Sequence, residues 1–218
     1  MFGRIAPRYD LLNRVLSLGI DRRWRRRLLD RAGNVRGARV VDAACGTGDL
    51  TLVLASAGAR VLGVDFTREM LLGAVRKRSE RAPCAFLQGD ALALPVRSGA
   101  ADLATIAFGI RNVEDRGLGL AELTRVLRSG GRLYVLEFSM PRGRVLGALY
   151  RSYFTRVLPR IGAIVSGDRQ AYRYLPDTVL AWPTPDELRS EMERAGLVDC
   201  GFELLTGGIA CLSWGRRP

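Results

Sequence analysis

The sequence predicts an α/β fold in which an open, mostly parallel sheet ends in an antiparallel hairpin. First, residues 40–50 read as a short β-branched strand, a Gly-x-Gly turn and the start of a helix. Second, apolar strand-like runs alternate with helix-like segments up to residue 138, which is typical of strand–helix–strand units. Third, a short glycine-rich link joins the apolar runs at 198–205 and 208–214 and requires a hairpin. Together these runs predict a seven-stranded sheet.

Composition indicates a single domain over residues 1–218. The hydrophobic fraction of 48% is ordinary for a globular protein with a proper core. No apolar run approaches the roughly 20 residues that a membrane helix needs. The first residues lack the apolar core of a signal peptide, so we expect a cytoplasmic protein. Because no Cys-x-x-Cys pair and no histidine occur, we expect no metal site and no imidazole base.

The net charge of +12 is concentrated in two segments. Residues 1–36 hold ten arginines and three acidic residues, and residues 139–176 hold seven arginines and one acidic residue. Surfaces of this kind attract anionic lipid or nucleic acid. The chain has 33 arginines and one lysine, Lys77, which indicates a compositional bias. That bias does not explain why acidic residues are scarce in these two segments.

The N-terminal segment, residues 1–36, is expected to be helical and basic. Apolar positions over 5–31 predict one or two helices that are interrupted at Gly19. Asp21 can cap the second helix, in which Trp24 belongs to the apolar face and arginines crowd the other positions. The arginine run is either a solvated face or a membrane or ligand contact.

The glycine turn at 40–50 predicts a binding site for a cationic cofactor. Asp42 ends the strand, Gly46 and Gly48 leave room for a ligand against the backbone, and Asp49 opens the helix. A loop that binds a diphosphate should avoid a carboxylate at this helix end, and Thr51 takes the place of a third glycine. S-adenosylmethionine, with its sulfonium and ammonium groups, therefore fits better than NAD. Alternatively, Asp49 only complements the helix dipole.

Acidic residues also follow the next two strands. Asp65 ends the strand at 60–65, some 20 residues after the glycine turn, where an acid that holds a ribose is expected. Thr67 can cap the helix that follows. Asp90 follows the strand at 84–88, where a polar contact to an adenine amino group is suitable. The alternative for Asp65 is a plain strand-end acid.

The residues that follow the fourth predicted strand indicate where the reaction takes place. Residues 101–108 are almost uniformly apolar, as in a buried central strand, and Arg111 and Asn112 follow its exit. Alternatively, Asn112 caps the helix at 118–127. A Ser-Gly-Gly sequence should end that helix before the strand at 132–138.

Residues 140–181 interrupt the strand–helix alternation. Apolar residues at helical spacing over 146–161, flanked by arginines, predict either a core-packing helix or a lid over an apolar substrate at a membrane face. Pro159 should kink or end this helix. A further helix at 182–197, capped by Thr184, precedes the hairpin.

Segments over nearly the whole chain follow the pattern of one enzyme family: residues 2–13, 41–51, 89–95, 108–113, 125–133, 136–139, 172–176 and 205–209. The chain resembles the UbiE/MenG-type C-methyltransferases of menaquinone and ubiquinone biosynthesis. The glycine turn is common to many methyltransferases, whereas the first segment and the Phe-Gly-x-Arg-Asn and Leu-Thr-Gly-Gly-Ile sequences are more specific. The resemblance implies a Rossmann-like, class I S-adenosylmethionine-dependent methyltransferase, with helical additions at the N-terminus and at 140–181.

The resemblance also implies cofactor contacts at particular positions. These are Thr51, Asp65, Asp90 and Ala91, beside the Asp42, Gly46 and Gly48 of the glycine turn. The family commonly has a serine in the strand before Phe108, where this chain has Ala107, so no side-chain contact is expected there.

The implied reaction is methyl transfer to a ring carbon of a prenylated hydroquinone. The acceptor is demethylmenaquinol or the ubiquinol-pathway intermediate 2-methoxy-6-polyprenyl-1,4-benzoquinol. Arg111, which stays protonated, is expected to stabilise the phenolate. The base is a water held by Arg111 and Asn112, or Asp10 or Tyr9.

A prenylated substrate would give the two basic segments a purpose. They are expected to dock the enzyme peripherally on the anionic inner face of the membrane, with 140–181 as a lid. A small soluble phenol or RNA remains an alternative acceptor. The Asn/Asp-Pro-Pro-Tyr sequence common in amino-methylating enzymes that act on nucleic acid is absent. The sequence leaves open the quinone pathway, the tail length and whether the chain forms a homodimer.

Overall fold

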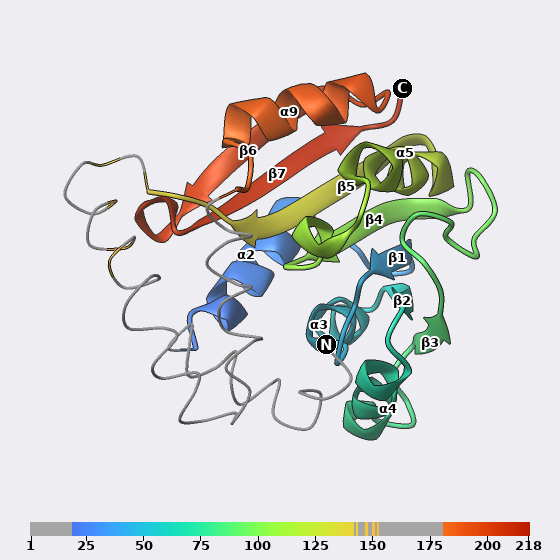
Figure 1. The fold of residues 1–218 in the computed structure, drawn as a ribbon. Helices are drawn as coiled ribbons and strands as arrows, with labels where there is room; N and C mark the ends of the chain where they lie inside the picture. Colours follow the sequence, from blue (N-terminus) through green and yellow to red (C-terminus); the bar gives the residue numbers. More distant parts are fainter. Residues whose placement is uncertain (1–18, 142, 144–146, 148–149, 151, 153–180) are drawn as a thin grey trace.

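The computed structural model describes residues 19–141, 143, 147, 150, 152 and 181–218. A seven-stranded sheet with the order β3-β2-β1-β4-β5-β7-β6 runs through this part of the chain (Figure 1). Its strands are β1 (Arg39–Ala43), β2 (Arg60–Asp65), β3 (Cys84–Gln88), β4 (Ala101–Ala107), β5 (Leu127–Phe138), β6 (Val198–Leu205) and β7 (Ala210–Arg216). The first five strands pair in parallel, whereas β7 is antiparallel to both β5 and β6. The predicted sheet and its C-terminal hairpin are confirmed.

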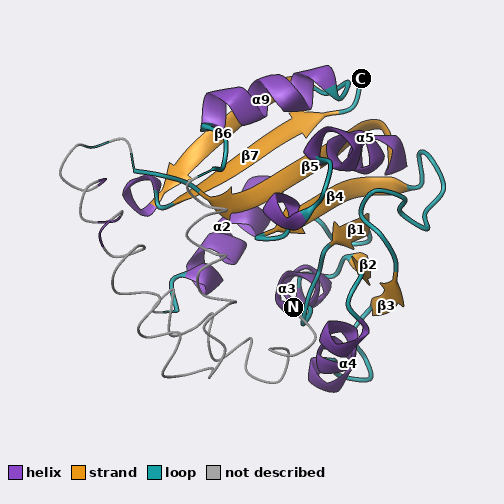
Figure 2. Cartoon of the chain, viewed as in Figure 1, coloured by secondary structure: helices purple, strands orange, loops and turns teal. Residues whose placement is uncertain are grey.

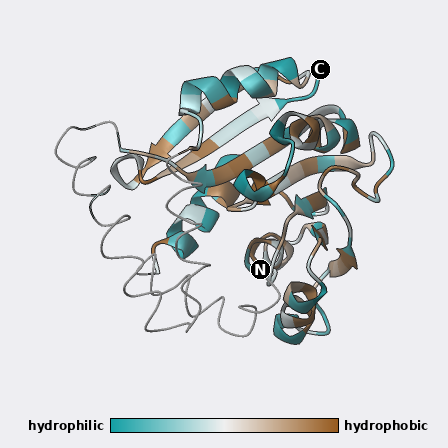
Figure 3. Cartoon of the chain, viewed as in Figure 1, coloured by the Kyte–Doolittle hydropathy of each residue, from teal (hydrophilic) through white to brown (hydrophobic). Residues whose placement is uncertain are grey.

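Helices lie on both faces of the sheet (Figure 2). They are α2 (Asp21–Ala32), α3 (Asp49–Ser56), α4 (Arg68–Lys77), α5 (Arg116–Val126) and α9 (Pro185–Arg194), with short 3-10 turns η1 (Ile110–Asn112) and η3 (Thr206–Gly208). One core contains buried residues of α2 and α3, and the other contains those of α5 and α9. Figure 3 shows hydrophobic residues along β4 and β5 and hydrophilic residues over much of α9. Burial of each large core side chain stabilises the fold by about 1.5–3 kcal/mol.

Element boundaries around α5 differ from the prediction. The helix begins at Arg116 rather than residue 118, because Asp115 caps it by accepting a hydrogen bond from the Leu118 amide at 2.9 Å. Strand β5 begins at Leu127 rather than residue 132, because Leu127 pairs with Ala101 before an irregularity in the register. Since Asp115 is the cap, the alternative role of Asn112 as a helix cap is wrong.

The other predicted helix starts have mixed outcomes. Thr184 caps α9 as predicted, in a capping box with Glu187, and Pro185 lies in the first turn. Asp21 begins α2, but its side chain forms an ion pair with Arg25 instead of capping the helix. Residues 1–18 and most of 140–181 lie outside the described residues, so the first N-terminal helix and the lid stay predictions.

Candidate functional site

A cavity of about 350 Å³ opens at the carboxyl ends of the parallel strands. This is the edge of an α/β sheet where nucleotide-like ligands bind, and the volume suits a small molecule. The loops after β1, β2, β3 and β4 supply most of the lining. The predicted residues among the lining are Asp42, Gly46, Asp49, Asp65, Asp90, Ala91 and Asn112.

The glycine turn brings backbone close to other parts of the site. Gly48 adopts a φ of +80°, and a Cβ at this position would lie 2.9 Å from the Phe86 ring. The Gly46 amide donates a hydrogen bond of 2.8 Å to the Asp65 carboxylate. Ala44 and Phe108, which also line the cavity, have positive φ values of 47° and 56°. Such values in residues other than glycine are costly and cluster at functional sites.

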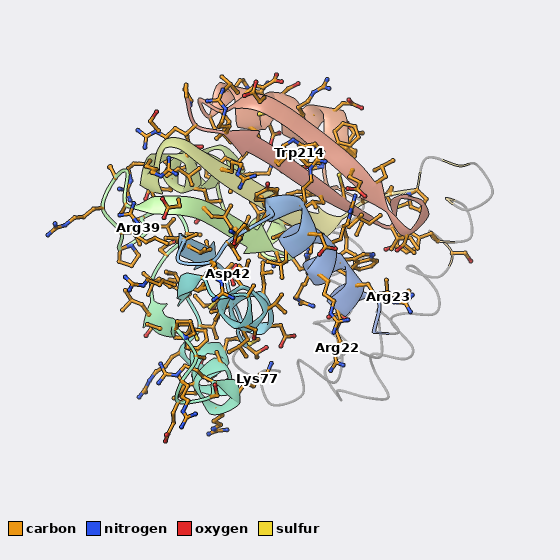
Figure 4. All side chains as sticks on the ribbon, turned by 180° about the vertical axis from the view of Figure 1, so that it is seen from behind. Arg22, Arg23, Arg39, Asp42, Lys77 and Trp214 are labelled. Atoms are coloured by element: carbon orange, nitrogen blue, oxygen red, sulfur yellow. The ribbon has the colours of Figure 1, made fainter. Side chains whose placement is uncertain are left out.

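Asp42 is buried beneath the cavity and is held by two hydroxyl groups. Its two carboxylate oxygens accept hydrogen bonds from Thr51 Oγ1 at 2.6 Å and Thr105 Oγ1 at 2.7 Å. Burial raises the pKa of Asp42 to about 6, although both hydroxyls lower it. Thr51 is fully buried and reaches the cavity through Asp42 rather than lining it. Figure 4 shows Asp42 between the sheet and α3.

Asp65 lies at the end of β2 with both carboxylate oxygens on backbone amides. Thr67 N donates to it at 2.8 Å, as does Gly46 N. Each carboxylate oxygen has a second lone pair, so Asp65 can still accept vicinal hydroxyl groups from the cavity. Burial raises the pKa of Asp65, and the amide hydrogen bonds oppose this shift. The geometry is compatible with the predicted ribose contact.

The next loop places Asp90 and Ala91 at the cavity. Asp90 Oδ1 accepts a hydrogen bond of 2.9 Å from Leu92 N, which fixes the turn after β3. Phe66, for which no role was predicted, lines the same cavity with 72% of its surface exposed. An exposed aromatic residue directly after the strand-end acid could have indicated a surface for a flat ring.

Asp49 is less available than the sequence suggested. Its carboxylate forms an ion pair with Lys77 Nζ at 2.8 Å and lies 3.9 Å from the Arg25 guanidinium. Lys77 Nζ also donates to Thr47 Oγ1 at 2.8 Å. The cavity as a whole is nevertheless acidic, because among its described lining residues five are acidic and one, Arg25, is basic. A ligand with positive charge therefore fits this lining better than a diphosphate does.

Arg111 and Asn112 occupy the exit of β4 as predicted, but they differ in position. Asn112 lines the cavity, whereas the mostly buried Arg111 lies behind it. Arg111 donates to the Phe108 carbonyl at 2.9 Å and forms an ion pair with Glu137 at the end of β5. Glu137 lies in the family-like segment 136–139 but had no predicted role in the site, although an acid at the carboxyl end of an apolar strand was a usable signal. Tyr9 and Asp10 lie outside the described residues.

No cluster of three histidine, cysteine or acidic side chains suited to a metal ion occurs among the described residues. The residues present fit S-adenosylmethionine. Acidic groups at the ends of β1, β2 and β3 can meet its cationic and hydroxyl groups, and Gly46 of the glycine turn lines the cavity without a side chain. Cys45 also lines the cavity, and burial raises the pKa of its thiol, so the thiol stays protonated.

Comparisons with solved structures support the fold. The putative methyltransferase of Haloferax volcanii, solved in complex with the Trm112 methyltransferase activator, is 18% identical with a TM-score of 0.75. That match covers 100% of this chain and 98% of the other. Phosphoethanolamine N-methyltransferase 2 of Haemonchus contortus, solved with S-adenosyl-L-methionine, has a TM-score of 0.68 at 14% identity over 89% of this chain and 52% of the other.

Curated relatives are similar over the full length. Demethylmenaquinone methyltransferase of Thermus thermophilus is 52% identical over 221 residues, which cover 100% of both chains. Ubiquinone/menaquinone biosynthesis C-methyltransferase UbiE of a Geobacter species (strain M21) is 47% identical over 100% of this chain and 94% of its own.

The sequence model of the ubiE/COQ5 methyltransferase family matches residues 1–217. These matches confirm the resemblance drawn from the sequence, the Rossmann-like methyltransferase fold and S-adenosyl-L-methionine as the cofactor. From the strand order, the acidic cavity and the full-length similarity together, we conclude that this chain belongs to the ubiE/COQ5 methyltransferase family.

Proposed function

We propose that this chain methylates a ring carbon of a prenylated hydroquinone, converting demethylmenaquinol to menaquinol with S-adenosylmethionine as the donor. The observation that carries the proposal is the 52% identity over the full length with a demethylmenaquinone methyltransferase. The 47% identity with a UbiE enzyme named for both pathways supports 2-methoxy-6-polyprenyl-1,4-benzoquinol as a second acceptor.

The residues at the strand ends would hold the donor. Asp65 would accept hydrogen bonds from the two ribose hydroxyls, and Asp90 and Ala91 would contact the adenine. The glycine turn of Gly46 and Gly48 lies against the amino-acid part, while Asp42, supported by Thr51, supplies negative charge beneath it. When bound, the donor supplies a methyl group on a positively charged sulfur. Holding this group against the acceptor carbon supplies much of the rate through proximity.

The acceptor side of the site is assigned to the exit of β4. Loss of the proton from a ring hydroxyl raises the electron density on the adjacent carbon, which then attacks the methyl group. Arg111 stabilises the resulting phenolate, because a guanidinium donates hydrogen bonds and keeps its charge. Asn112, which lines the cavity, orients the acceptor or a bound water. Tyr9 and Asp10 remain proposed contributors from the N-terminal segment.

We also propose that the enzyme docks on the cytoplasmic face of the membrane through its basic segments, with 140–181 as the lid. Arg22, Arg23 and Arg26 of α2 are exposed, and Figure 4 shows Arg22 and Arg23 projecting from the beginning of this helix, away from the sheet. Such a surface is attracted to anionic lipid, where a prenylated quinol resides. Among the described residues, none of the helices has the length and hydropathy needed to cross a bilayer.

A methyl-transfer assay tests the proposal. The purified chain is incubated with S-adenosylmethionine labelled in its methyl group and, in parallel, with short-chain demethylmenaquinol, 2-methoxy-6-prenyl-1,4-benzoquinol or RNA. The expected result is label in the demethylmenaquinol, at a ring carbon by mass spectrometry. Label in the RNA alone, or in none of the three, would contradict the proposal.

A further inference from the structure

Arg111 and Glu137 form a buried ion pair at the carboxyl ends of β4 and β5. Only 8% of the Arg111 side chain and 1% of the Glu137 side chain are exposed. The same Arg111 nitrogen also donates to the Phe108 carbonyl, and the same Glu137 oxygen, Oε1, also accepts from Phe138 N at 2.9 Å. The contact therefore joins one nitrogen to one oxygen, whereas structural arginine–carboxylate pairs are frequently bidentate.

This single contact leaves polar atoms over. Arg111 Nε, Glu137 Oε2 and Asn112 Oδ1 are buried and have no hydrogen-bond partner among the described residues. Leaving a buried polar group without a hydrogen-bond partner destabilises the fold, and more so when the group is charged. The three atoms comprise one donor and two acceptors, which is what a hydroxyl group requires, since it both donates and accepts.

The surroundings suit an aromatic acceptor. Arg111 lies over the Phe138 ring at 5.3 Å, and the Phe138 and Phe108 rings are 4.8 Å apart. Trp24 of α2 packs on both rings. Phe108 and Asn112 line the donor cavity. Phe108 contacts Phe138, over which Arg111 lies, so the aromatic rings connect the cavity to the ion pair.

We propose that Glu137 is the proton acceptor for the ring hydroxyl of the quinol and that Arg111 Nε donates to the same oxygen; this inference rests on the proposed function. The O–H bond breaks and its proton moves to Glu137 Oε2, while the electron pair passes into the ring. The ring carbon bonds to the methyl group as the carbon–sulfur bond breaks, and sulfur keeps that electron pair. The ring carbon then loses its hydrogen to water as a proton, and Glu137 returns its own proton to the oxygen.

The charges around Glu137 are compatible with this role. Burial raises the pKa of Glu137, and the Arg111 guanidinium opposes the shift. Arg111 is the charged group that acts on Glu137 within the described chain. Cys211 lies opposite on β7, and its thiol is 3.6 Å from the Ser213 hydroxyl. A raised pKa brings the carboxylate closer to the range in which a general base works near neutral pH.

The test compares wild type with Glu137→Gln, which keeps the shape and an oxygen for Arg111 but cannot accept the proton. With demethylmenaquinol, kcat should fall by about 100-fold or more, the range for loss of a general base. The Kd for S-adenosylmethionine should stay within about twofold, because Glu137 does not line the donor cavity. Glu137→Asp should recover part of the rate. Glu191→Gln is the matched control, since it removes a different glutamate–arginine pair, with Arg116, and should keep turnover.

The pH profile supplies a second readout if Glu137→Gln does not fold. The kcat of the wild type should fall on the acidic side as Glu137 becomes protonated, and this limb should move to higher pH in Arg111→Met, because the nearby positive charge is lost. Wild-type turnover in a folded Glu137→Gln, or an acidic limb unmoved in Arg111→Met, would overturn this inference while leaving the proposed function intact. A wild-type chain that methylates no quinol would overturn both.

Discussion

The carboxylates of the cavity differ, residue by residue, in what holds them. Asp65 accepts from two backbone amides and keeps lone pairs for a ligand, whereas both Asp42 oxygens accept from threonine hydroxyls. Asp49 shares its charge with Lys77. We therefore expect Asp65 to contact the methyl donor directly and Asp42 to act mainly on the electrostatics and stability of the site.

Replacing Asp65 should weaken the binding of the methyl donor. In Asp65→Asn the amide cannot accept on both sides, so S-adenosylmethionine should bind about tenfold to a hundredfold less tightly, equivalent to about 1.5–3 kcal/mol. Isothermal titration calorimetry measures this change. The control is Asp199→Asn on β6. The Asp199 carboxylate accepts a hydrogen bond of 2.8 Å from Arg216 Nε and does not line the cavity. Equal affinities in Asp65→Asn and wild type would show that Asp65 does not hold the donor.

The raised pKa of Asp42 predicts a pH-dependent stability. The folded chain holds the Asp42 proton more tightly than the unfolded chain, with a pKa of about 6 against 3.8. This contribution is fully present below the unfolded pKa and is lost as pH rises through the folded one. Relative to Asp42→Asn, the unfolding free energy of wild type should fall by about 3 kcal/mol from about pH 3 to pH 7, as measured by urea denaturation. A constant difference would contradict the shift.

Among the elements, the turn between β1 and α3 depends on close packing as well as on backbone freedom. Gly48 and Gly99 both have positive φ, at +80° and +69°. A Cβ at Gly48 would overlap the Phe86 ring, whereas a Cβ at Gly99 meets nothing within 4 Å. The pair of positions therefore separates backbone strain from steric overlap.

Both glycine substitutions should destabilise, but unequally. Gly99→Ala carries the backbone penalty of about 1 kcal/mol, and Gly48→Ala adds about 1–3 kcal/mol of overpacking. Chemical denaturation gives the two free energies of unfolding, and calorimetry should show weaker donor binding in Gly48→Ala alone. If the two variants lost the same stability, packing against Phe86 would not be what restricts this turn.

Helix α2 provides the described part of the proposed membrane contact. The triple variant Arg22→Gln, Arg23→Gln and Arg26→Gln should float less with anionic liposomes. Each arginine near the lipid surface contributes about 1 kcal/mol to the binding free energy. Added salt should reduce wild-type flotation in the same way. The control changes three exposed arginines elsewhere, Arg68, Arg76 and Arg97, with the same loss of charge. Equal flotation of the two triple variants would remove α2 from the membrane contact.

Over the whole molecule, the sheet was predictable because its signals are local. Most of the strands contain a short apolar run, and the hairpin follows from the short link between β6 and β7. The start of β5 was missed because Leu127 joins the sheet through Ala101, a partner distant in sequence. Asp115 displaced Asn112 as the helix cap because the chain turns once, in η1, before α5 begins.

The candidate site was predictable to a similar degree. Acidic residues at strand ends converge because parallel strands place their carboxyl ends at one edge of the sheet. Ion pairs between residues distant in sequence were not predictable. Arg111 and Glu137 are 26 residues apart, and Asp49 and Lys77 are 28 residues apart. Each pairing changes what the residue can do, because it fixes which atoms remain for a ligand.

The proposed methyl transfer requires that the acidic cavity select a cationic methyl donor over a dinucleotide. Calorimetric titration of the purified chain with S-adenosylmethionine and, separately, with NAD tests this requirement most directly. We predict saturable binding of S-adenosylmethionine at one site per chain and no measurable binding of NAD. Binding of NAD together with no binding of S-adenosylmethionine would show that the cavity is not a site for this methyl donor.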